Sequence, residues 1–150
     1  DTSLFFRRIA LSFASSIVDT DIEFTSLITE DLPSISVDSL KMRQALLNLL
    51  RNAHDACIAI TQPAITLSVS PDPQDSSMLW ITVTDNGCGI KPEDQASVFE
   101  PFITHKADGT GLGLAVTRRI ILAHHGTITL DSTPGTGTTF SITLPIQENT

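Results

Sequence analysis

The sequence predicts a two-layer α/β sandwich, in which three helices cover one face of a mixed, mainly antiparallel sheet of about five strands. Two pairs of short segments alternate between apolar and polar residues, and each pair is joined by a turn, as in β-hairpins. Three helical segments are interleaved with them. The 150 residues, 41% of them hydrophobic and 17% charged, suit one domain with a packed core.

The first half of the chain supplies two helices and one strand. Residues 4–18 have apolar side chains four positions apart, which predicts an amphipathic helix. Residues 21–28 form a weaker strand candidate. Asp38 is a suitable N-cap for a long leucine-rich helix that we expect to run to about Ile60 and to be ended by Pro63.

The first predicted hairpin follows this helix. Residues 65–69 and 79–83 alternate cleanly, and residues 71–77 contain the turn between them. A polar stretch punctuated by glycine and proline then runs from 86 to 110. Long connections of this kind are usually functional, so we expect it to border a site.

A third helix and a second hairpin complete the predicted fold. The helix is expected from about Leu112 to His124, with Gly126 as its C-terminal stop. The alternating residues 128–130 and 140–144 are joined by a Pro-Gly-Thr-Gly turn, which predicts the last two strands.

The charge balance excludes some partners. The formal net charge is −8, from 17 Asp and Glu against 9 Lys and Arg, which disfavours nucleic acid and an anionic membrane surface. It does not exclude an anionic ligand, because backbone amides and a metal ion can hold one. Cys57 and Cys88 are too few for a disulfide framework and are expected to be reduced thiols of a cytosolic protein.

The N-terminus and the hydropathy of the chain lead to three further expectations. No apolar run approaches the length that spans a bilayer. The first residues lack the basic region of a signal peptide. The chain does not begin with Met, so we expect it to be a fragment of a longer protein.

Asp85 is the first candidate site residue. It continues the apolar alternation of the preceding strand, and a carboxylate on a buried face is costly unless it is hydrogen-bonded. Gly87 and Gly89 follow, and they would let the backbone pass close to a flat ligand. An ionised Asp only accepts hydrogen bonds, which suits an exocyclic amino group such as that of adenine. The alternative is an Asp-Asn-Gly turn with a solvated carboxylate.

Two glycine-containing segments are weaker candidates. Residues 109–114 (GTGLGL) open the last helix, where free amides can bind an anion. The segment is neither a Walker A loop nor the Rossmann fingerprint. Residues 135–140 form the turn of the last hairpin, from which the hydroxyls of Thr138 and Thr139 could reach a ligand.

Asn48, Asn52 and Asp55 are spaced to lie on one face of the long helix. One interpretation is hydrogen bonding within the core or capping. The other is a hard-cation site, because an amide oxygen can hold Mg²⁺ without repelling a polyphosphate.

Five segments in this order resemble the ATP-binding catalytic domain of sensor histidine kinases, which belongs to the superfamily of gyrase B, Hsp90 and MutL. They are the N box (46–56), the first glycine box (85–90), the F box (99–102), the second glycine box (109–114) and the terminal hairpin (135–140). The resemblance extends from about Leu4 to Ile146 and implies a Bergerat-type fold. The F box and the residues after it, including Thr104 and Lys106, resemble the nitrogen-regulator and dicarboxylate-sensor subgroup.

The resemblance implies a role for each matching residue. Asn52 matches the Mg²⁺-binding Asn, and Asn48 matches a second Asn of the nucleotide site. Asp85 matches the acceptor for the adenine amino group, Gly89 lines the base, and Thr138 reaches adenine through water. Together with Lys106, the two Asn side chains are the expected catalytic set.

The second glycine box matches the phosphate-side hinge of an ATP lid that spans about 90–110. Lys106 is the expected cationic contact to the phosphates. Phe99 and Phe102 match the lid anchor, with ordinary core packing as the alternative. The residues expected to contact the nucleotide are Asn48, Asn52, Asp55, Asp85, Gly87, Gly89, Ile90, Phe102, Thr104, Lys106, Gly109, Thr110, Gly111, Leu112, Gly113, Leu114 and Thr138.

The sequence departs from the family at two points. No phosphoacceptor motif is present, and His54 lies inside the N box, so we do not expect it to be the acceptor. The other histidines are His105, His124 and His125. Asp55 stands where some family members have a phosphate-contacting Lys, which leaves Lys106 ahead of Arg118 or Arg119 as the cation.

The implied function is transfer of the γ-phosphoryl group of Mg-ATP to a histidine on the kinase's own or its partner chain's dimerisation domain, in two-component signalling. Residues 1–150 would be the catalytic domain alone, cytoplasmic or the cytosolic end of a membrane-bound sensor, monomeric by itself and part of a homodimeric kinase that acts on a response regulator. We expect no contact with nucleic acid or membrane. The alternatives are an anti-sigma-type Ser/Thr kinase or an ATPase of the superfamily, and a non-catalytic nucleotide-dependent interaction module.

Overall fold

The computed structural model describes residues 1–101 and 113–148. Its elements, in chain order, are α1 (Thr2–Ser16), β1 (Glu23–Ile28), α2 (Ser39–Ala56), β2 (Ala64–Pro71), β3 (Met78–Asp85), α3 (Pro92–Gln95), α4 (Gly113–Ala123), β4 (Thr127–Thr133) and β5 (Gly137–Pro145).

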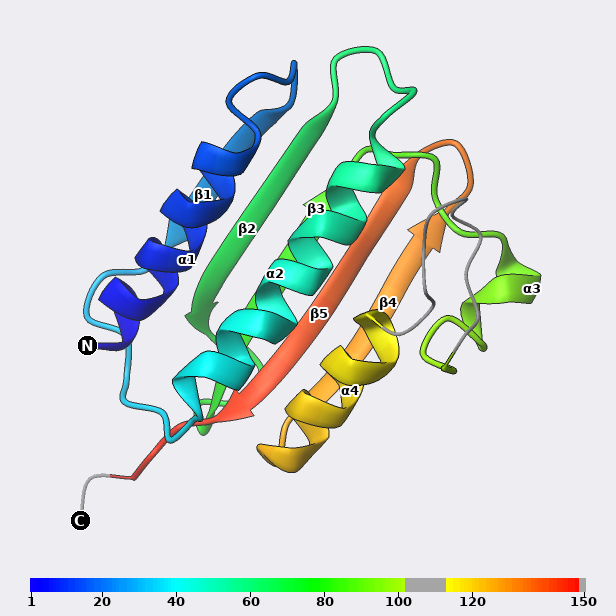
Figure 1. Ribbon diagram of the computed structural model, residues 1–150. Coiled ribbons are helices and arrows are strands. Elements are labelled where there is room, and N and C mark those ends of the chain that lie inside the picture. The colour runs from blue at the N-terminus through cyan, green and yellow to red at the C-terminus, as the bar shows by residue number, and fades with distance from the viewer. Residues whose placement is uncertain (102–112, 149–150) are drawn as a thin grey trace.

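The strands form one five-stranded sheet in the order β1-β2-β3-β5-β4. β1 pairs with β2 in parallel, and the other three pairs are antiparallel. Helices α1, α2 and α4 lie side by side across one face of this sheet, and the short α3 lies beyond the β4 edge (Figure 1). The predicted fold class, a mixed and mainly antiparallel two-layer sandwich under three helices, is confirmed.

The core lies between the helices and the sheet. The alternating residues of β2, β3 and β5 turn one face inward, and α2 buries its leucines against that face. Asp38 caps α2 as predicted, because its Oδ1 accepts from the backbone N–H groups of Leu40 and Lys41 at 3.1 Å each. α2 is therefore fixed at its start by a cap and along its length by burial.

The expected end of α2 near Ile60 is wrong, because the helix ends at Ala56. Continuing the helix would need the Ala56 carbonyl to accept from the N–H of Ile60. That carbonyl instead accepts from the N–H of Cys88 at 3.1 Å, in the loop after β3. The residues after Ala56 form a tighter turn, in which the N–H of Ile60 donates to the Cys57 carbonyl at 3.1 Å. A contact from a distant part of the chain thus ends the helix.

Other boundaries differ by a few residues. The helix expected over 4–18 begins and ends two residues earlier, and the strand expected from 21 begins at Glu23. The stretch expected to be an irregular connection contains α3. Both hairpins and their turns are confirmed. No helix in the described ranges combines the length and apolar character needed to cross a bilayer.

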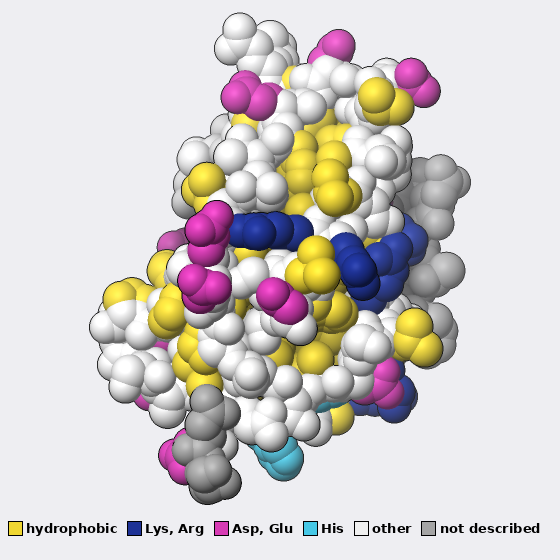
Figure 2. All heavy atoms as spheres, turned by 90° about the vertical axis from the view of Figure 1, so that its left-hand side faces the viewer, with side chains coloured by type: hydrophobic (Ala, Val, Ile, Leu, Met, Phe, Trp, Pro, Cys, Tyr) yellow, Lys and Arg dark blue, Asp and Glu magenta, His cyan; other side chains and the backbone are white. Residues whose placement is uncertain are grey.

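Most of the basic residues lie in the three long helices. α1, α2 and α4 carry seven of the nine Lys and Arg residues of the chain but one acidic residue, Asp55. The other sixteen acidic residues lie outside these three helices. Figure 2, which shows the α1 and β1 edge, has dark blue side chains in a band across its middle. The helix layer is therefore basic within an acidic protein.

Candidate functional site

A polar row closes one end of the otherwise apolar inner face of the sheet. The strand register places Asp85 opposite Thr138, and Thr138 opposite Ser132. The next inner row along the same strands consists of Val83, Phe140 and Leu130. Three neighbouring strands thus each end their apolar alternation with one side chain that carries oxygen.

Asp85 is 7% exposed, as its place in the alternation predicts. Its Oδ1 accepts from the backbone N–H of Gly87 at 2.8 Å. Burial raises the pKa of this carboxyl above its ordinary value, and the backbone N–H groups of Gly87 and Thr138 partly offset that rise. The carboxyl group is held in one place and retains acceptor capacity for a ligand.

The loop after Asp85 passes unusually close to other backbone. A Cβ at Gly87 would lie 2.5 Å from the carbonyl oxygen of Ala56. Gly89 has a φ of +73°, and a Cβ there would collide with the carbonyl oxygen of Thr133. The glycines therefore press this loop against α2 on one side and against the last hairpin on the other.

Asn86 anchors the same loop, a role that the sequence interpretation missed. Its Oδ1 accepts from the N–H of Ala64 at 2.8 Å, and its Nδ2 donates to the Gln62 carbonyl at 3.0 Å. The buried Cys57 thiol also points at this oxygen, at 3.8 Å. Burial is the main cause that raises the pKa of Cys57, so this residue behaves as a thiol rather than a thiolate.

Ser132 is a second residue that the interpretation missed. Its Oγ accepts from the N–H of Ile90 at 2.8 Å and lies 2.7 Å from Thr138 Oγ1. It also donates to the carbonyl of Gly137, at 3.1 Å. Alternation could have found Ser132, because it shares the inward face of β4 with Ile128 and Leu130.

Gln95, at the end of α3, joins the same group. Its Nε2 donates to the carbonyls of Ile90 and Ser132, at 3.0 Å each. The first glycine box and the last hairpin are thus linked by both side chains, Gln95 and Ser132. No periodicity in the sequence points to Gln95.

The polar face of α2 borders α4. Asn48 Nδ2 lies 3.4 Å from the Gly113 carbonyl, which also accepts from Thr117 Oγ1 at 2.8 Å. Asn52 and Asp55 are half-buried further along the helix. Asp55 Oδ1 lies 3.1 Å from Nδ1 of its neighbour His54. The start of α4 is therefore attached to the predicted metal-binding face of α2.

Part of the predicted site falls outside the described residues: Phe102, Thr104, Lys106, Gly109, Thr110, Gly111 and Leu112, together with His105. Of the expected lid anchor, Phe99 is described. It is half-buried and packs edge-on against Phe140, with ring centroids 6.1 Å apart. Leu114 is half-buried against the core and Gly113 is exposed.

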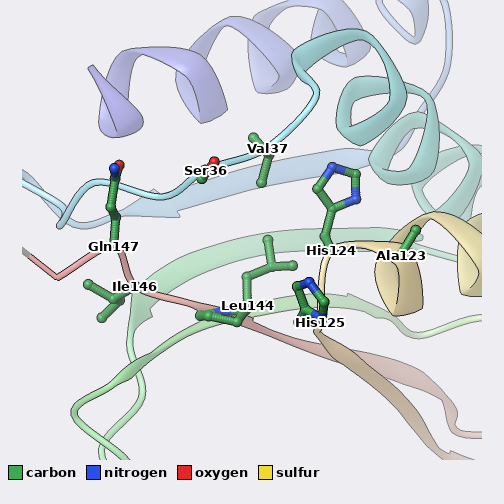
Figure 3. A pocket seen from close by; sticks show the side chains of 9 residues that line it. Ser36, Val37, Ala123, His124, His125, Leu144, Ile146 and Gln147 are labelled. Carbon is green, nitrogen blue, oxygen red and sulfur yellow. The ribbon is translucent and has the colours of Figure 1, made fainter.

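A cavity of about 310 Å³ lies at the opposite end of β5 from Thr138, beside Leu144 and Pro145 (Figure 3). His124 forms part of its wall. The ring of His124 connects α4 to the cap of α2, because Nε2 accepts from the N–H of Asp38 at 3.0 Å and Nδ1 donates to the Ile120 carbonyl at 2.7 Å. Apart from His124 and His125, this cavity contains no candidate residue of the sequence interpretation. His124 is accounted for as a connection between helices.

The side-chain oxygens available on α2 suit a hard cation whose remaining ligands are phosphate oxygens of the nucleotide. Within the described parts of the chain, no group of three or more His, Cys, Asp or Glu side chains is placed to hold a metal ion. The amide oxygens of Asn48 and Asn52 suit Mg²⁺, which prefers oxygen and commonly binds through few protein groups and several phosphate oxygens.

The sequence matches a family model and several curated proteins. The family model described as histidine kinase-, DNA gyrase B- and HSP90-like ATPase matches residues 37–148. The signal transduction histidine-protein kinase AtoS of Escherichia coli is 43% identical over 86% of this chain and 21% of its own length. The sensor histidine kinase ZraS of Salmonella typhimurium is 41% identical over 84% of this chain and 26% of its own. The chain therefore spans about a fifth to a quarter of these curated relatives.

Solved structures resemble the fold over nearly its whole length. The mycobacterial sensor histidine kinase MprB superposes with a TM-score of 0.83 and 26% identity, over 99% of this chain and 98% of that one. Full-length ShkA in complex with AMPPNP superposes with a TM-score of 0.82 and 28% identity, over 99% of this chain and 31% of that one.

Proposed function

This chain belongs to the histidine kinase-, DNA gyrase B- and HSP90-like ATPases, as an ATP-binding catalytic domain of the sensor histidine kinase type, and from that premise we propose that it binds Mg-ATP and transfers the γ-phosphoryl group to a histidine. We place the acceptor on the dimerisation domain of the same or a partner chain, and residues 1–150 form the catalytic domain alone. The full-length kinase then passes the phosphoryl group to a response regulator.

The buried carboxylate of Asp85 carries this proposal. It is the acidic member of a polar row that ends an apolar sheet face, and a glycine loop held against two neighbouring elements surrounds it. Such an acceptor at the end of a largely apolar sheet face complements the amino edge of a purine. An Asp that served only as a turn residue would gain nothing from being buried to 7% exposure. Burial would instead be costly, because it removes water from the carboxylate.

We propose that the base binds beside Asp85 and Thr138, with the backbone of Gly87, Gly89 and Ile90 along its face. The phosphates then extend towards the joint between α2 and α4, where Asn48 lies near Gly113. The second glycine box, Thr104 and Lys106 are proposed to contact the phosphates. Asp55 lies near them on α2, and the basic helix layer favours an anion on that side of the molecule.

In the proposed reaction an imidazole nitrogen of the acceptor attacks the γ-phosphorus, the bond to the bridging oxygen breaks, and ADP leaves. A neutral imidazole is already nucleophilic, so this chain positions the nucleotide rather than supplying a strong base. Asn52, with Asn48 beside it, would hold Mg²⁺. Bound Mg²⁺ neutralises charge on the phosphate oxygens.

Cellular placement is part of the same proposal. A kinase of this type acts on ATP and on response regulators, so we place the domain in the cytoplasm, in a homodimeric full-length protein. The isolated domain is proposed to be monomeric, without direct contact with membrane or nucleic acid.

Calorimetry with ATP and ADP, with and without Mg²⁺, tests the binding part. Asp85→Ala should weaken ATP and ADP alike, by roughly 10- to 100-fold, because both carry adenine and a charge-assisted hydrogen bond is lost. Asn52→Ala should remove the Mg²⁺ dependence of ATP binding and leave the fold intact. Asp131→Ala removes an exposed carboxylate of β4 and is the matched control. Unchanged Mg-ATP affinity in Asn52→Ala contradicts the metal assignment.

Labelled ATP supplied together with the dimerisation domain of AtoS tests the transfer part. A kinase yields acid-labile, alkali-stable phosphate on that domain. An ATPase would release labelled phosphate without labelling the dimerisation domain. A Ser/Thr kinase would give an acid-stable label on a protein acceptor. An interaction module would give neither free phosphate nor labelled protein.

A further inference from the structure

The hydroxyl of Ser132 has three polar contacts but a single proton. The N–H of Ile90 donates to Ser132 Oγ at 2.8 Å, so that contact uses a lone pair. The carbonyl of Gly137, at 3.1 Å, can only accept and therefore needs the Ser132 proton. Thr138 Oγ1, at 2.7 Å, must then act as the donor in the third contact.

One proton arrangement satisfies all three contacts. In it Ser132 donates to Gly137, and Thr138 donates to Ser132. In the other arrangement Ser132 donates to Thr138, and two lone pairs then face each other between Ser132 Oγ and the Gly137 carbonyl. Because Gly137 and Thr138 are both buried, this repulsive contact between Ser132 Oγ and the Gly137 carbonyl is costly. The first arrangement is favoured, and it leaves Thr138 Oγ1 with acceptor lone pairs alone.

Thr138 is also the cross-strand partner of Asp85. Directly opposed residues of antiparallel strands have their Cβ atoms roughly 5 Å apart, so the two side chains present two acceptors side by side. A water molecule that bridged them would donate both of its protons to them and could itself only accept. This pair of acceptors complements the two N–H bonds of a 6-amino purine and repels the carbonyl oxygen of a 6-oxo purine.

We propose that Ser132 is a positioning residue for base selection, which favours 6-amino over 6-oxo purine nucleotides by holding the Thr138 hydroxyl as an acceptor. The inference rests on the proposed function, because it concerns the same nucleotide site. Ser132 acts through Thr138 and does not itself touch the base.

The surroundings of Ser132 keep it in this position. The Gln95 side chain donates to the carbonyls of both Ser132 and Ile90, at 3.0 Å. Ser132 is therefore fixed through its own carbonyl as well as through its hydroxyl. The side chain is thereby kept in contact with the Gly137 carbonyl, which can only accept and so sets the direction of the Ser132 proton.

Loss of the Ser132 hydroxyl frees the Thr138 proton. Thr138 can then rotate and donate to a 6-oxo group, so the site loses discrimination rather than binding strength in general. Inosine diphosphate is the matched probe, because it differs from ADP at the six-position and at the protonation of the adjacent ring nitrogen.

Calorimetry on the full 150-residue chain with ADP and with inosine diphosphate tests this inference. Wild type should prefer ADP, and Ser132→Ala should reduce the ratio of the two affinities about tenfold, which is the size of one hydrogen-bond mismatch. Ser132→Thr keeps a hydroxyl and should restore most of the preference. Ser141→Ala, on the opposite face of the sheet, should leave the ratio unchanged.

The same measurements in a Thr138→Val background separate positioning from a general structural effect. If Ser132 acts through Thr138, Ser132→Ala should no longer change the ratio in that background. Equal weakening of both nucleotides by Ser132→Ala, or a wild type without preference, overturns the inference while the proposed function stands. A wild type that binds neither nucleotide overturns both.

Discussion

Replacing Gly87 by alanine tests how tightly the first glycine box is pressed against α2. The added Cβ would lie 2.5 Å from the carbonyl oxygen of Ala56 and 2.7 Å from its carbonyl carbon and Cβ. Ordinary contacts of a Cβ fall between 3.4 and 4 Å, so one of the two segments must move by about 1 Å. Two of these three atoms are backbone and the third is a Cβ, so rotation of a side chain cannot relieve the overlap.

The loss of folding stability has three contributions, namely one overpacked contact and two weakened hydrogen bonds. Overpacking of this kind costs about 1–3 kcal/mol. Movement of the loop also weakens the hydrogen bond from Cys88 to the Ala56 carbonyl and the bond from Gly87 to Asp85. Each intact bond contributes about 0.5–1.5 kcal/mol, and because both are weakened rather than lost, a total of about 3 kcal/mol is expected. For a chain of this length, that lowers the unfolding midpoint by roughly 6–12 °C.

Thermal and urea unfolding, followed by circular dichroism, measure this change. Gly113→Ala is the stability control, because a Cβ at Gly113 meets no atom within 4 Å, and it should change the free energy of unfolding by no more than about 1 kcal/mol. We also expect Gly87→Ala to weaken ADP binding, since Asp85 loses its fixed position. A midpoint within about 2 °C of wild type would refute the reasoning, because it would mean that the loop yields at little cost.

The remaining predictions concern the site carboxyl and the core. Burial raises the folded-state pKa of Asp85 above its unperturbed 3.8, so the folded protein binds this proton more tightly than the unfolded chain, and stability falls as pH rises from that value through the raised pKa. Asp85→Asn removes this decline, and urea titrations across that window should give a flatter pH profile than wild type; superimposable profiles would contradict it. Leu49→Ala, at a fully buried position of α2, should cost about 2–5 kcal/mol in chemical denaturation. Leu40→Ala on the same helix, where the residue is 79% exposed, should cost little, and equal losses would show that burial is not the cause.

Local patterns predict most of the fold because its strands are half-buried. Period-two alternation locates both hairpins, and the same alternation is enough to assign Asp85 to the inner face of β3. Asp38 likewise marks the start of α2 through its capping chemistry. These features depend on neighbours in sequence, which a pattern can detect.

Non-local contacts account for what the patterns missed. The end of α2 is set by Cys88, about thirty residues after Ala56, and no local signal records that hydrogen bond. The parallel pairing of β1 with β2 depends on how α2 crosses over the sheet. Gln95 acquires its role through two carbonyls that the tertiary fold brings together. Ser132, in contrast, could have been identified from the sequence, because it continues the alternation of Ile128 and Leu130.

The helices α1, α2 and α4 carry seven basic residues and one acidic residue, while the protein as a whole has a net charge of −8. At a distance, a nucleoside triphosphate is repelled by the negative net charge of the protein. Within about a Debye length, roughly 8 Å at physiological ionic strength, it interacts mainly with the nearest side chains, which on the helices are largely basic. The approach to the helix side is therefore favoured over the approach to the open face of the sheet, and salt weakens both the repulsion and the guidance. Orientation during encounter is thus a property of the layer arrangement, separate from the contacts that hold the bound nucleotide.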